Sequence, residues 1–564
     1  MKANWVFEPL PSQQDISELS KSINVNTYIS ALLIQRTIRT FEQAKAFFRP
    51  SLDNLLDPFE MKDMDKAVVR LQKAIQNKEK ILIYGDYDVD GTTSVALVYG
   101  FLKEFYDNLL YYTPDRYLEG YGVSQKGIEW AAQQDVQLVI ALDCGIKANE
   151  EVDFAKQKGI DFIICDHHRP EDSLPKAVAV LDPKRNDCPY PYKELSGCGI
   201  GFKFLQAFCQ KDNIDLEKLY QHLDLVALSI SADIVPITGE NRLLAAIGLE
   251  KINQNARSGI LALIEKAQLR LPIKVSNIVF GIAPRINAVG RLAHANAAID
   301  LLLAKNMEDA RRLADSAENH NDERRGFDLE ATEEAVLMIK KNKTGYTNVL
   351  FKNNWHKGII GIVASRCIEH EYRPTIILTE SNGKATGSAR SVKDFDIYEA
   401  ISECADLLEQ YGGHQYAAGL TMPLENIVPF REKFERVVQQ KIKPEQLIRQ
   451  IEVDLEIPLA AINQRFYDIL KQMEPFGPKN MQPVFVTRNV EPFSVKLLKD
   501  KHLKMQVKQG NKYMEAIGFD MATHHKRIIQ GENFDICYVV TENEYMGYKN
   551  LQLMLKAIHF KNDT

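Results

Sequence analysis

The sequence predicts an α/β protein. A parallel-sheet domain is joined by a long helix to a second, smaller α/β domain, and a small β-barrel or sandwich follows. Three observations predict this. Strand-sized apolar runs alternate with polar helical stretches within residues 79–304, which is typical of a parallel sheet. Residues 305–341 are rich in Ala and charged residues and contain no Pro, which favours a helix. Beyond Arg449 the chain is rich in strand-like runs.

Each element can be placed in order. Residues 1–78 are expected to form an N-terminal helical region, with helices over residues 40–48 and 65–76. In the first α/β domain (79–304), a helix is expected from about Ser94, and strands at 81–84, 136–142 and 162–165. The connecting helix (305–343) is expected to be interrupted near Asn319–Asn321. The second α/β domain is assigned 344–447, with strands near 348–351 and 375–378, and the C-terminal unit 448–564, with strands near 483–487, 505–507, 536–541 and 551–555.

Composition excludes several classes of protein. The 564 residues suggest three to four folding units, and 45% hydrophobic with 26% charged residues exclude a disordered or collagen-like chain. The net charge of -6 argues against a protein that coats nucleic acid without specificity. No apolar run approaches the ~18 residues that span a bilayer, and no signal peptide or membrane association is expected. None of the eight Cys forms a CxxC pair, so a reducing cytoplasm is the expected compartment.

The sharpest local feature is an acidic loop after the first predicted strand, Gly85-Asp86-Tyr87-Asp88-Val89-Asp90-Gly91. Three carboxylates this close repel one another, and a bound cation would relieve that cost. The pattern also opens an EF-hand calcium loop. That reading needs a Glu six residues after the Gly, where Leu97 stands, and a helix before the loop, where a strand is predicted. A purely structural turn is the remaining alternative.

Two further predicted strands end in the same kind of residue. One runs into Asp143, and the next into Asp166-His167-His168. The carboxyl ends of parallel strands meet at one edge of a sheet, so these side chains are expected to converge with the acidic loop. Carboxylates with one or two imidazoles suit Mn²⁺ or Mg²⁺. Two ions are expected, the arrangement used in phosphodiester hydrolysis. His168 is alternatively a residue that orients its neighbours without binding metal.

The order of motifs along the chain resembles the DHH phosphoesterase superfamily and, within it, the RecJ family of single-strand-specific exonucleases. The likeness spans residues from about 26 to 560. The motifs that carry it are the acidic loop, LDCGI (142–146), DHH (166–168), SADIVP (231–236), PRINAVGR (284–291), GSARS (387–391), YGGH (411–414) and PFGPKN (475–480). The resemblance implies that the C-terminal unit is an OB-like, nucleic-acid-binding barrel and that residues 344–447 are the DHH-associated domain.

The resemblance also implies a ligand set. One metal ion would be held by Asp86, Asp88 and Asp143. The other would be held by Asp90, Asp143, His167 and Asp233, with Asp143 bridging and His168 counted among the catalytic residues. The nucleophile would be a metal-bound water. Asp224, nine residues before Asp233, is the alternative ligand, although it lies in an amphipathic run and is also compatible with a solvated helix position.

Phosphate and DNA contacts are implied in the second domain and beside the acidic loop. Glycines allow close approach of a backbone to phosphate, and arginines suit charge-assisted contacts. Residues 417–419 (Ala-Ala-Gly) are expected to start a helix with small side chains. A tight turn and surface ion pairs are the structural alternatives, and the role of His356 stays open. The candidates are Arg116, Arg285, Ser388, Arg390, Ser391, Gly412, Gly413 and His414.

The chain departs from the family pattern at two positions. Thr37 and Lys479 stand where the family usually has Gly, which leaves the placement of the terminal regions less certain than that of the metal ligands. A glycine-rich run, Gly197-Cys198-Gly199-Ile200-Gly201, lacks the spacing and the preceding strand of a dinucleotide site.

A basic stretch marks the C-terminal unit. Arg488–Lys512 holds seven Lys and Arg against Glu491 and Asp500, with Phe485 and Phe493 in or beside it. Basic strands with aromatic residues suit single-stranded DNA bound through phosphates and base stacking. A solvated basic face is the alternative.

The function implied is a two-metal exonuclease that degrades single-stranded DNA 5′ to 3′ to 5′-mononucleotides in DNA repair and recombination. A DHH phosphodiesterase acting on short oligonucleotides or cyclic dinucleotides is one alternative. A non-catalytic DHH scaffold of a replication complex is the other. The chain is expected to be a monomer that works with a helicase and a single-strand-binding protein.

Overall fold

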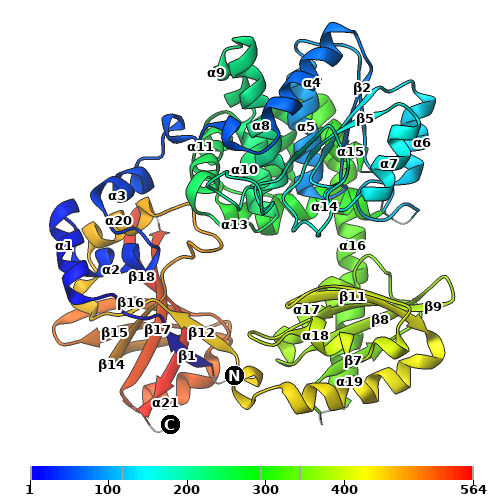
Figure 1. Cartoon of the computed structure of the whole chain (residues 1–564). Coiled ribbons are helices and arrows are strands. Elements are labelled where there is room, and N and C mark those ends of the chain that lie inside the picture. Colours follow the sequence, from blue (N-terminus) through cyan, green and yellow to red (C-terminus); the bar gives the residue numbers. More distant parts are fainter. Residues whose placement is uncertain (1–2, 117, 293–294, 342–344, 546, 562–564) are drawn as a thin grey trace.

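The computed structural model describes residues 3–116, 118–292, 295–341, 345–545 and 547–561. Figure 1 shows the first α/β domain at the top, joined through the long helix α16 (Met307–Lys341) to the second α/β domain at the lower right. The N-terminal helices and the C-terminal barrel form a third body at the lower left. The domain boundary expected between residues 343 and 344 lies outside the described residues.

The first α/β domain is built on a parallel sheet, which confirms the predicted fold class. The strand order is β3-β2-β4-β5-β6, and every pairing is parallel. Its strands are β2 (Ile81–Gly85), β3 (Leu109–Tyr112), β4 (Leu138–Leu142), β5 (Asp161–Cys165) and β6 (Ala179–Leu181). Its flanking helices are α4 (Met64–Gln76), α5 (Val89–Leu102), α6 (Gln125–Gln133) and α7 (Asn149–Gln157). β2 and β4 are buried throughout because helices cover both faces.

Helix α5 begins earlier than the sequence suggested. It starts at Val89 and not near Ser94, because the Asp88 carboxylate accepts a hydrogen bond from the Gly91 N–H at 3.1 Å and caps the helix. The acidic loop is therefore held between a buried strand and a helix N-terminus.

A helical layer completes this domain. Its elements are α8 (Gly197–Asp212), α9 (Leu216–Tyr220), α10 (Leu223–Ala232), α11 (Gly239–Asn255), α12 (Ser258–Lys266), α13 (Val275–Asn277), the π-helical turn η3 (Ile278–Ile282), α14 (Ala283–Leu292) and α15 (Asn296–Leu302). Helix α10 is buried on nearly all sides. The amphipathic run and solvated position expected around Asp224 are therefore wrong, since a helix buried all round has no polar face.

The predicted interruption of the connecting helix is wrong, since α16 runs unbroken through Asn319–Asn321. Asn321 is buried within it, and its Oδ1 accepts a hydrogen bond from Arg324 Nη2 at 2.9 Å. The helix packs against α12, α14 and α15 on one domain and against α17 on the other. This tertiary packing outweighs the weak helix propensity of Asn.

The second α/β domain has the strand order β10-β11-β9-β8-β7. Its elements are β7 (Asn348–Phe351), α17 (Ile360–His370), β8 (Thr375–Ser381), β9 (Lys384–Arg390), α18 (Ile397–Ser402), β10 (Gln410–His414), β11 (Ala417–Pro423) and α19 (Ile427–Lys441), with short 3₁₀ turns at Ala405–Leu407, Leu424–Asn426 and Pro444–Leu447. The helix start expected at 417–419 is wrong, because these residues form a hairpin strand opposite Gly412 and Gly413.

The N-terminal helices share one apolar core with the barrel. The barrel order β14-β15-β16-β18-β17 is closed by pairing of β14 with β17, and β13 joins β14 in parallel. The N-terminal elements are β1 (Asn4–Phe7), α1 (Gln13–Ile23), α2 (Thr27–Gln35), α3 (Phe41–Phe48) and the 3₁₀ turns η1 (Leu52–Asn54) and η2 (Pro58–Glu60). The C-terminal elements are β12 (Gln450–Val453), β13 (Leu455–Glu456), η7 (Leu459–Ala461), α20 (Gln464–Gln472), β14 (Phe485–Leu498), β15 (His502–Gln509), β16 (Lys512–Gly518), η8 (Ala522–His524), α21 (His525–Ile529), β17 (Phe534–Tyr545) and β18 (Tyr548–Phe560).

Residues 1–78 are therefore not one structural unit. Leu32 and Ile34 of α2 are buried with Phe485 and Tyr538 of the barrel, whereas α4 packs into the core of the first α/β domain. β1 pairs in parallel with β12, although most of the chain separates the two strands in the sequence. Among the described residues, no helix is long and apolar enough to cross a membrane.

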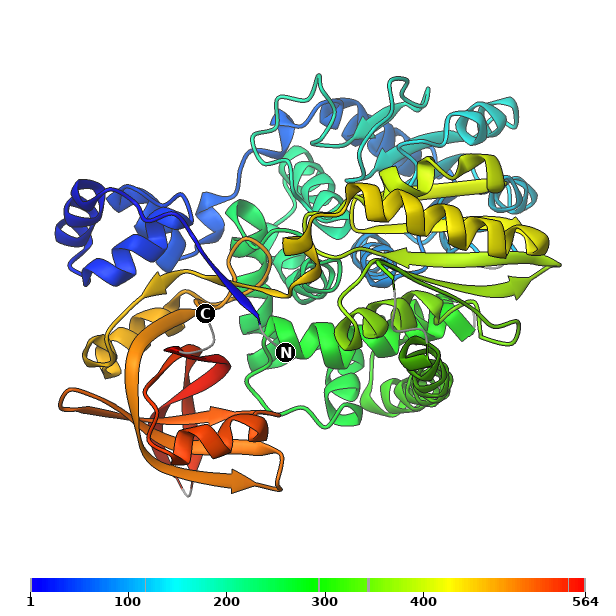
Figure 2. The ribbon, with the colours of Figure 1, turned by 90° about the horizontal axis from the view of Figure 1, so that it is seen from below.

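Figure 2 shows the three bodies from below. Polar contacts fix the barrel body against the other two. The Arg242 guanidinium on α11 donates to the carbonyls of Met473 and Glu474, both at 2.9 Å, and to that of Phe47 at 3.1 Å. The Ile237 N–H donates to the Pro478 carbonyl at 2.8 Å. Between the second α/β domain and the barrel body, Lys393 Nζ lies 2.5 Å from Glu452 Oε1 of β12.

Candidate metal centre and phosphate pocket

The predicted ligands meet at the carboxyl edge of the parallel sheet. Asp86 and Asp88 lie between β2 and α5, Asp90 is in the first turn of α5, and Asp143 directly follows β4. His167 and His168 follow β5, and Asp233 ends α10. Asp143 has a backbone φ of +58°, a conformation that an Asp tolerates better than most residues and that is often found at functional sites.

The imidazole of His167 is at the centre of this cluster. Its Nε2 lies 3.1 Å from Asp143 Oδ1, 3.6 Å from Asp233 Oδ2 and 3.7 Å from Asp90 Oδ2. Ligand atoms of Asp90, His167 and Asp233 all lie within 4.8 Å of one another, as do those of Asp143, His167 and His168. His167 thus belongs to two overlapping groups of possible metal ligands.

Several polar atoms of the cluster are buried without a hydrogen-bond partner among the described residues. They are Asp86 Oδ2, Asp143 Oδ1 and both ring nitrogens of His167. A buried polar group left unpaired is costly, and native proteins rarely leave one so. Oxygen and imidazole donors in one buried crevice fit Mn²⁺ or Mg²⁺, which would satisfy these atoms.

The carboxyl groups are electrostatically strained without a cation. Burial and the charge of Asp88 raise the pKa of Asp86 to about 8, and burial and the charges of Asp90 and Asp88 raise the pKa of Asp233 to about 8. Burial and neighbouring acids also raise the pKa of Asp143 well above its ordinary value. Bound cations would favour the ionised forms of these groups.

The two histidines have different environments. Burial lowers the pKa of His167, which keeps its ring neutral as a metal ligand must be. Burial opposes the charge of His168 as well, but a 2.8 Å hydrogen bond and the charge of Asp166 outweigh it and raise the pKa of His168 to about 9. Asp166 also accepts hydrogen bonds from the backbone N–H groups of Ile146 and His167. Asp166 therefore holds the DHH turn in place.

Sequence reasoning missed the residues that hold Asp90. Its carboxylate accepts hydrogen bonds from the Gly197 N–H at 2.7 Å, the Cys198 N–H at 2.9 Å and the Ser229 hydroxyl at 2.7 Å. The first two donors are at the N-terminus of α8, where a carboxylate is favoured. The signal was the glycine-rich run 197–201, which was considered only as a dinucleotide motif.

The alternative ligand Asp224 lies elsewhere. It is buried in α10, and its carboxylate receives two 2.7 Å hydrogen bonds from Arg257. Asp233 is the residue of this pair that lies beside His167.

A second polar cavity, of about 590 Å³, opens in the second α/β domain. Arg390 Nη1 donates to Ser388 Oγ at 3.0 Å. Gly361 of α17 leaves room for this pair, since a Cβ there would lie 2.9 Å from Arg390 Nη2. Of the predicted phosphate-binding residues, those that line the cavity are Arg116, Ser388, Arg390 and Gly412. Arg116 comes from the first α/β domain, so the cavity joins two domains.

Other predicted contacts have different surroundings. The Ser391 hydroxyl donates to the Phe395 carbonyl at 2.6 Å, and His414 Nδ1 accepts from the Tyr416 N–H at 3.3 Å beside the hairpin turn after Gly413. His356 stacks on Phe327 of α16 with ring centroids 5.5 Å apart. Ser391, His414 and His356 do not line the second polar cavity.

Arg285 requires a correction as a DNA-contact candidate. Its side chain is buried, and its guanidinium forms an ion pair with Glu318 of α16 and donates to the Gly281 carbonyl at 2.6 Å. Because its donors are directed into the protein, Arg285 holds α14 against α16.

The barrel surface carries part of the expected basic, aromatic face. Phe493 is 63% exposed and meets Tyr513 edge-on at 4.9 Å, with Lys508 above the Tyr513 ring. Phe485 is fully buried in the barrel core, so it is not available to stack on a base. Lys504 and Lys508 lie 3.8 Å from Glu515 and Glu491, which reduces the local positive charge.

Comparison with known proteins decides the family. The single-stranded-DNA-specific exonuclease RecJ of Bacillus subtilis is 34% identical over 561 residues, which cover 98% of this chain and 70% of that protein. The chain belongs to the RecJ family. The Haemophilus influenzae RecJ is 33% identical, over 90% of this chain and 92% of that protein. Models of the DHH family N-terminal domain, the DHHA1 domain and the RecJ OB domain match residues 80–230, 342–440 and 453–557.

Solved structures agree with this membership. RecJ of Thermus thermophilus in complex with Mn²⁺ has a TM-score of 0.85 and 24% identity, covering 99% of this chain and 79% of that one, which shows the shared fold. A structure of exonuclease RecJ bound to manganese has a TM-score of 0.60 and 29% identity, covering 69% of this chain and 98% of that one.

The two departures from the RecJ pattern now have a structural meaning. Thr37 and Lys479 have φ values of +63° and +61°, in the left-handed region that favours glycine. Both lie at the contact between α2 and the loop 477–481, where Arg36 donates to Asn480 Oδ1 at 3.0 Å and to the Met481 carbonyl at 2.9 Å. The fold is kept at both positions despite the conformational cost.

Proposed function

We propose that this chain is a metal-dependent exonuclease that degrades single-stranded DNA from 5′ to 3′ and releases 5′-mononucleotides. The observation that carries the hydrolytic part is the set of buried, unpartnered oxygen and nitrogen atoms of Asp86, Asp143 and His167 at one sheet edge. The single-strand preference is supported by the similarity to single-stranded-DNA-specific exonucleases. Polarity and product rest on the family resemblance.

The proposed ligand sets are Asp86, Asp88 and Asp143 for one ion, and Asp90, Asp143, His167 and Asp233 for the other. Two Mn²⁺ or Mg²⁺ ions, when bound there, would supply an activated water and stabilise charge on the phosphate oxygens. The chain's own contribution is to hold the ligands. Gly197 and Cys198 fix Asp90, and burial keeps His167 neutral.

His168 is proposed to act toward the substrate. Its side chain is 43% exposed, and the charge of Asp166 keeps it protonated at neutral pH. A cationic imidazole at the mouth of the crevice favours an approaching phosphate.

Phosphates farther along the strand are proposed to bind in the second polar cavity, through Arg390 and Arg116. Burial lowers the pKa of Arg390, yet arginine stays charged. Ser388 and Gly412 border the same cavity, which suits close approach of a phosphate. Ser391, Gly413 and His414 are proposed to shape its rim. The barrel, with Phe493 and Tyr513 exposed, is proposed to bind the strand before it enters.

The test uses end-labelled single-stranded DNA, duplex DNA and a dinucleotide, each with Mn²⁺ or Mg²⁺. The expected result is mononucleotides released first from the 5′ end of the single strand, and loss of cleavage in Asp143→Ala. Preference for the dinucleotide would support a small-substrate phosphodiesterase. No metal-dependent cleavage of any substrate, or full activity in Asp143→Ala, would overturn the proposal.

DNA repair and recombination are the proposed setting, with a helicase and a single-strand-binding protein as partners that supply the strand. The proposed compartment is a reducing cytoplasm, supported by eight cysteines that are all buried and free.

A further inference from the structure

Phe280 is the most exposed large apolar side chain among the described residues, with 82% of its surface accessible. It lies in the π-helical turn η3, a conformation often found at functional sites. Its neighbours fix the backbone, since Ile278 and Ile282 are fully buried. Gly281 packs so closely on Leu269 that a Cβ would lie 2.9 Å from the Leu269 side chain. The exposed ring is therefore presented by a rigid segment.

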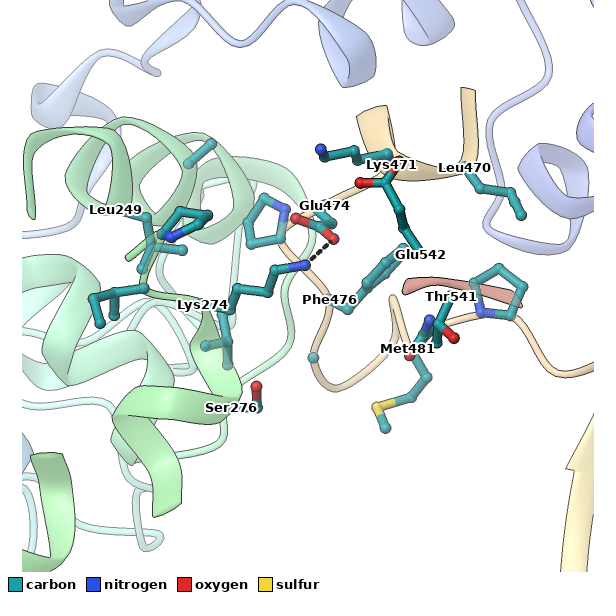
Figure 3. A pocket seen from close by; sticks show the side chains of 18 of the residues that line it. Leu249, Lys274, Ser276, Leu470, Lys471, Glu474, Phe476, Met481, Thr541 and Glu542 are labelled. Carbon is teal, nitrogen blue, oxygen red and sulfur yellow. Dashed lines mark hydrogen bonds and ion pairs between the residues drawn. The ribbon is translucent and has the colours of Figure 1, made fainter. Parts of the chain in front are cut away.

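On one side, Phe280 lies near a cavity shared by two bodies of the protein. Ser276, about one helical turn earlier, lines a cavity of about 690 Å³ between the first α/β domain and the loop that leads into the barrel. Figure 3 shows Ser276 and Lys274 on one wall and Phe476 and Met481 on the other. Met481 is 62% exposed, so both sides of this opening offer apolar surface.

On the other side, the same helical segment leads to the acidic loop. η3 continues directly into α14, and Gly290 of α14 packs against the Tyr87 carbonyl, which a Cβ would approach to 2.6 Å. Ten helical residues separate positions 280 and 290, which corresponds to about 15 Å along the axis. The segment that carries Phe280 therefore runs from the barrel-side cavity at Ser276 to the acidic loop at Gly290.

The charges near the cavity do not favour a phosphate. Lys274 Nζ is 2.7 Å from Glu474 Oε1, an ion pair that spans the cavity in Figure 3. Lys471 faces the same space as Glu250 and Glu542, so positive and negative groups are mixed. An aromatic ring in mixed charge suits the flat face of a nucleobase better than the DNA backbone.

We propose that Phe280 stacks on a base of single-stranded DNA that passes from the barrel toward the metal centre. This inference rests on the proposed function and adds a base-contact position to it. Stacking on an aromatic side chain accepts any base, so Phe280 would hold the strand without reading its sequence.

The test measures binding of the full-length protein to a fluorescent single-stranded oligonucleotide in EDTA, which prevents cleavage. Phe280→Ala is expected to weaken binding about tenfold, Phe280→Tyr to preserve it and Phe280→Leu to lose most of it. Single abasic sites are then placed in turn along the oligonucleotide. At one position the missing base should weaken wild-type binding about tenfold and leave Phe280→Ala unaffected.

Phe41→Ala is the matched control, because Phe41 is 51% exposed at the start of α3 and does not line the cavity beside Ser276. The inference is overturned if wild type and Phe280→Ala bind equally well, or if every abasic site weakens both proteins equally. In either case, cleavage of single strands by the wild type still upholds the proposed function. Full binding by Phe280→Leu would show that binding does not need an aromatic face and also overturns it. A wild type that neither binds nor cleaves single strands overturns both.

Discussion

Gly197 lies directly against Asp143, and a Cβ at Gly197 would come within 2.6 Å of the Asp143 Cβ. The same glycine donates its backbone N–H to Asp90 at 2.7 Å. One small residue at the start of α8 thus contacts two of the proposed metal ligands, one by steric fit and one by a hydrogen bond.

Gly197→Ala is predicted to abolish most nuclease activity while the protein still folds. The added methyl group must push Asp143 aside, and overpacking of this kind costs about 1–3 kcal/mol. A misplacement of about 1 Å at a reacting centre can cost ~10²-fold in rate. Single-turnover cleavage and thermal unfolding measure the two effects. Gly326→Ala is the control, because nothing lies within 4 Å of a Cβ at that position in α16. Equal activity in both variants would contradict the prediction.

Metal binding is predicted to stabilise the protein more as the pH rises. In the metal-free fold the pKa values of Asp86 and Asp233 are raised to about 8 from an ordinary value of 3.8. The folded state therefore holds protons that the unfolded chain has released between those values. This contribution to stability is complete below about pH 4 and is lost as the pH rises through about 8. Metal must compete with those protons.

The measurement is the rise in melting temperature caused by Mn²⁺ at about pH 6 and about pH 9. The rise should be clearly larger at the higher pH, and Asp86→Asn should reduce the difference. A metal-induced shift that is the same at both pH values would show that these carboxyls do not bind the ion.

Thr37→Gly is predicted to stabilise the protein by up to about 1 kcal/mol. Its φ of +63° is unfavourable for a β-branched residue by roughly 1–2 kcal/mol, and the greater freedom of glycine in the unfolded chain offsets part of the gain. Lys479→Gly should behave similarly because its φ is +61°. The free energy of unfolding in urea checks both. Thr37→Ala, which keeps a Cβ, is the comparison and should not show the gain.

Arg285→Ala is predicted to lower stability by about 2 kcal/mol and to leave the salt dependence of DNA binding unchanged. Its guanidinium is bonded to Glu318 and the Gly281 carbonyl, and hydrogen bonds to charged groups contribute roughly 1.5–3 kcal/mol. Arg390→Ala should show the opposite pattern, with a smaller salt slope because one phosphate contact is lost. A reduced salt slope in Arg285→Ala would restore Arg285 as a DNA contact.

Arg242→Met is predicted to destabilise the contact between the barrel body and the first α/β domain by about 3–5 kcal/mol. The guanidinium satisfies carbonyls at the ends of α3 and α20 and lies 3.7 Å above the Phe47 ring, so its removal leaves several buried acceptors unpaired. Lys lacks the planar fork, and Arg242→Lys should recover little. Limited proteolysis near residues 48–58 and urea unfolding report the loss.

Much of the site could be predicted from the chain. The acids after β2, β4 and β5 follow strands whose apolar runs are visible in the sequence, and parallel strands bring their carboxyl ends together. Asp233 was different, because α10 is buried all round and gives no periodic signal, so only the family motif singled it out. Ser229 had no local signal, and the glycine-rich run that contains Gly197 did not point to Asp90. Both roles depend on a carboxylate more than 100 residues away.

Errors in the predicted fold have the same origin. Asn319–Asn321 suggested a break in α16 because local propensity is weak there, but contacts with two domains sustain the helix. The hairpin at 410–423 was missed because its glycines and alanines show no strand alternation. Arg285 fits a phosphate contact in sequence, and only the position of Glu318 on a distant helix shows where its charge is directed.

By itself, the sequence determined the α/β class, the barrel, the acidic loop and the DHH turn, because local periodicity and strand-end residues specify them. The tertiary structure decided which body the N-terminal helices join, how Asp90 and Arg285 are held, and that Phe280 faces solvent. The physical reason is that burial and pairing depend on partners far away in the chain. The residues next to a side chain in the sequence do not indicate which distant group it will contact.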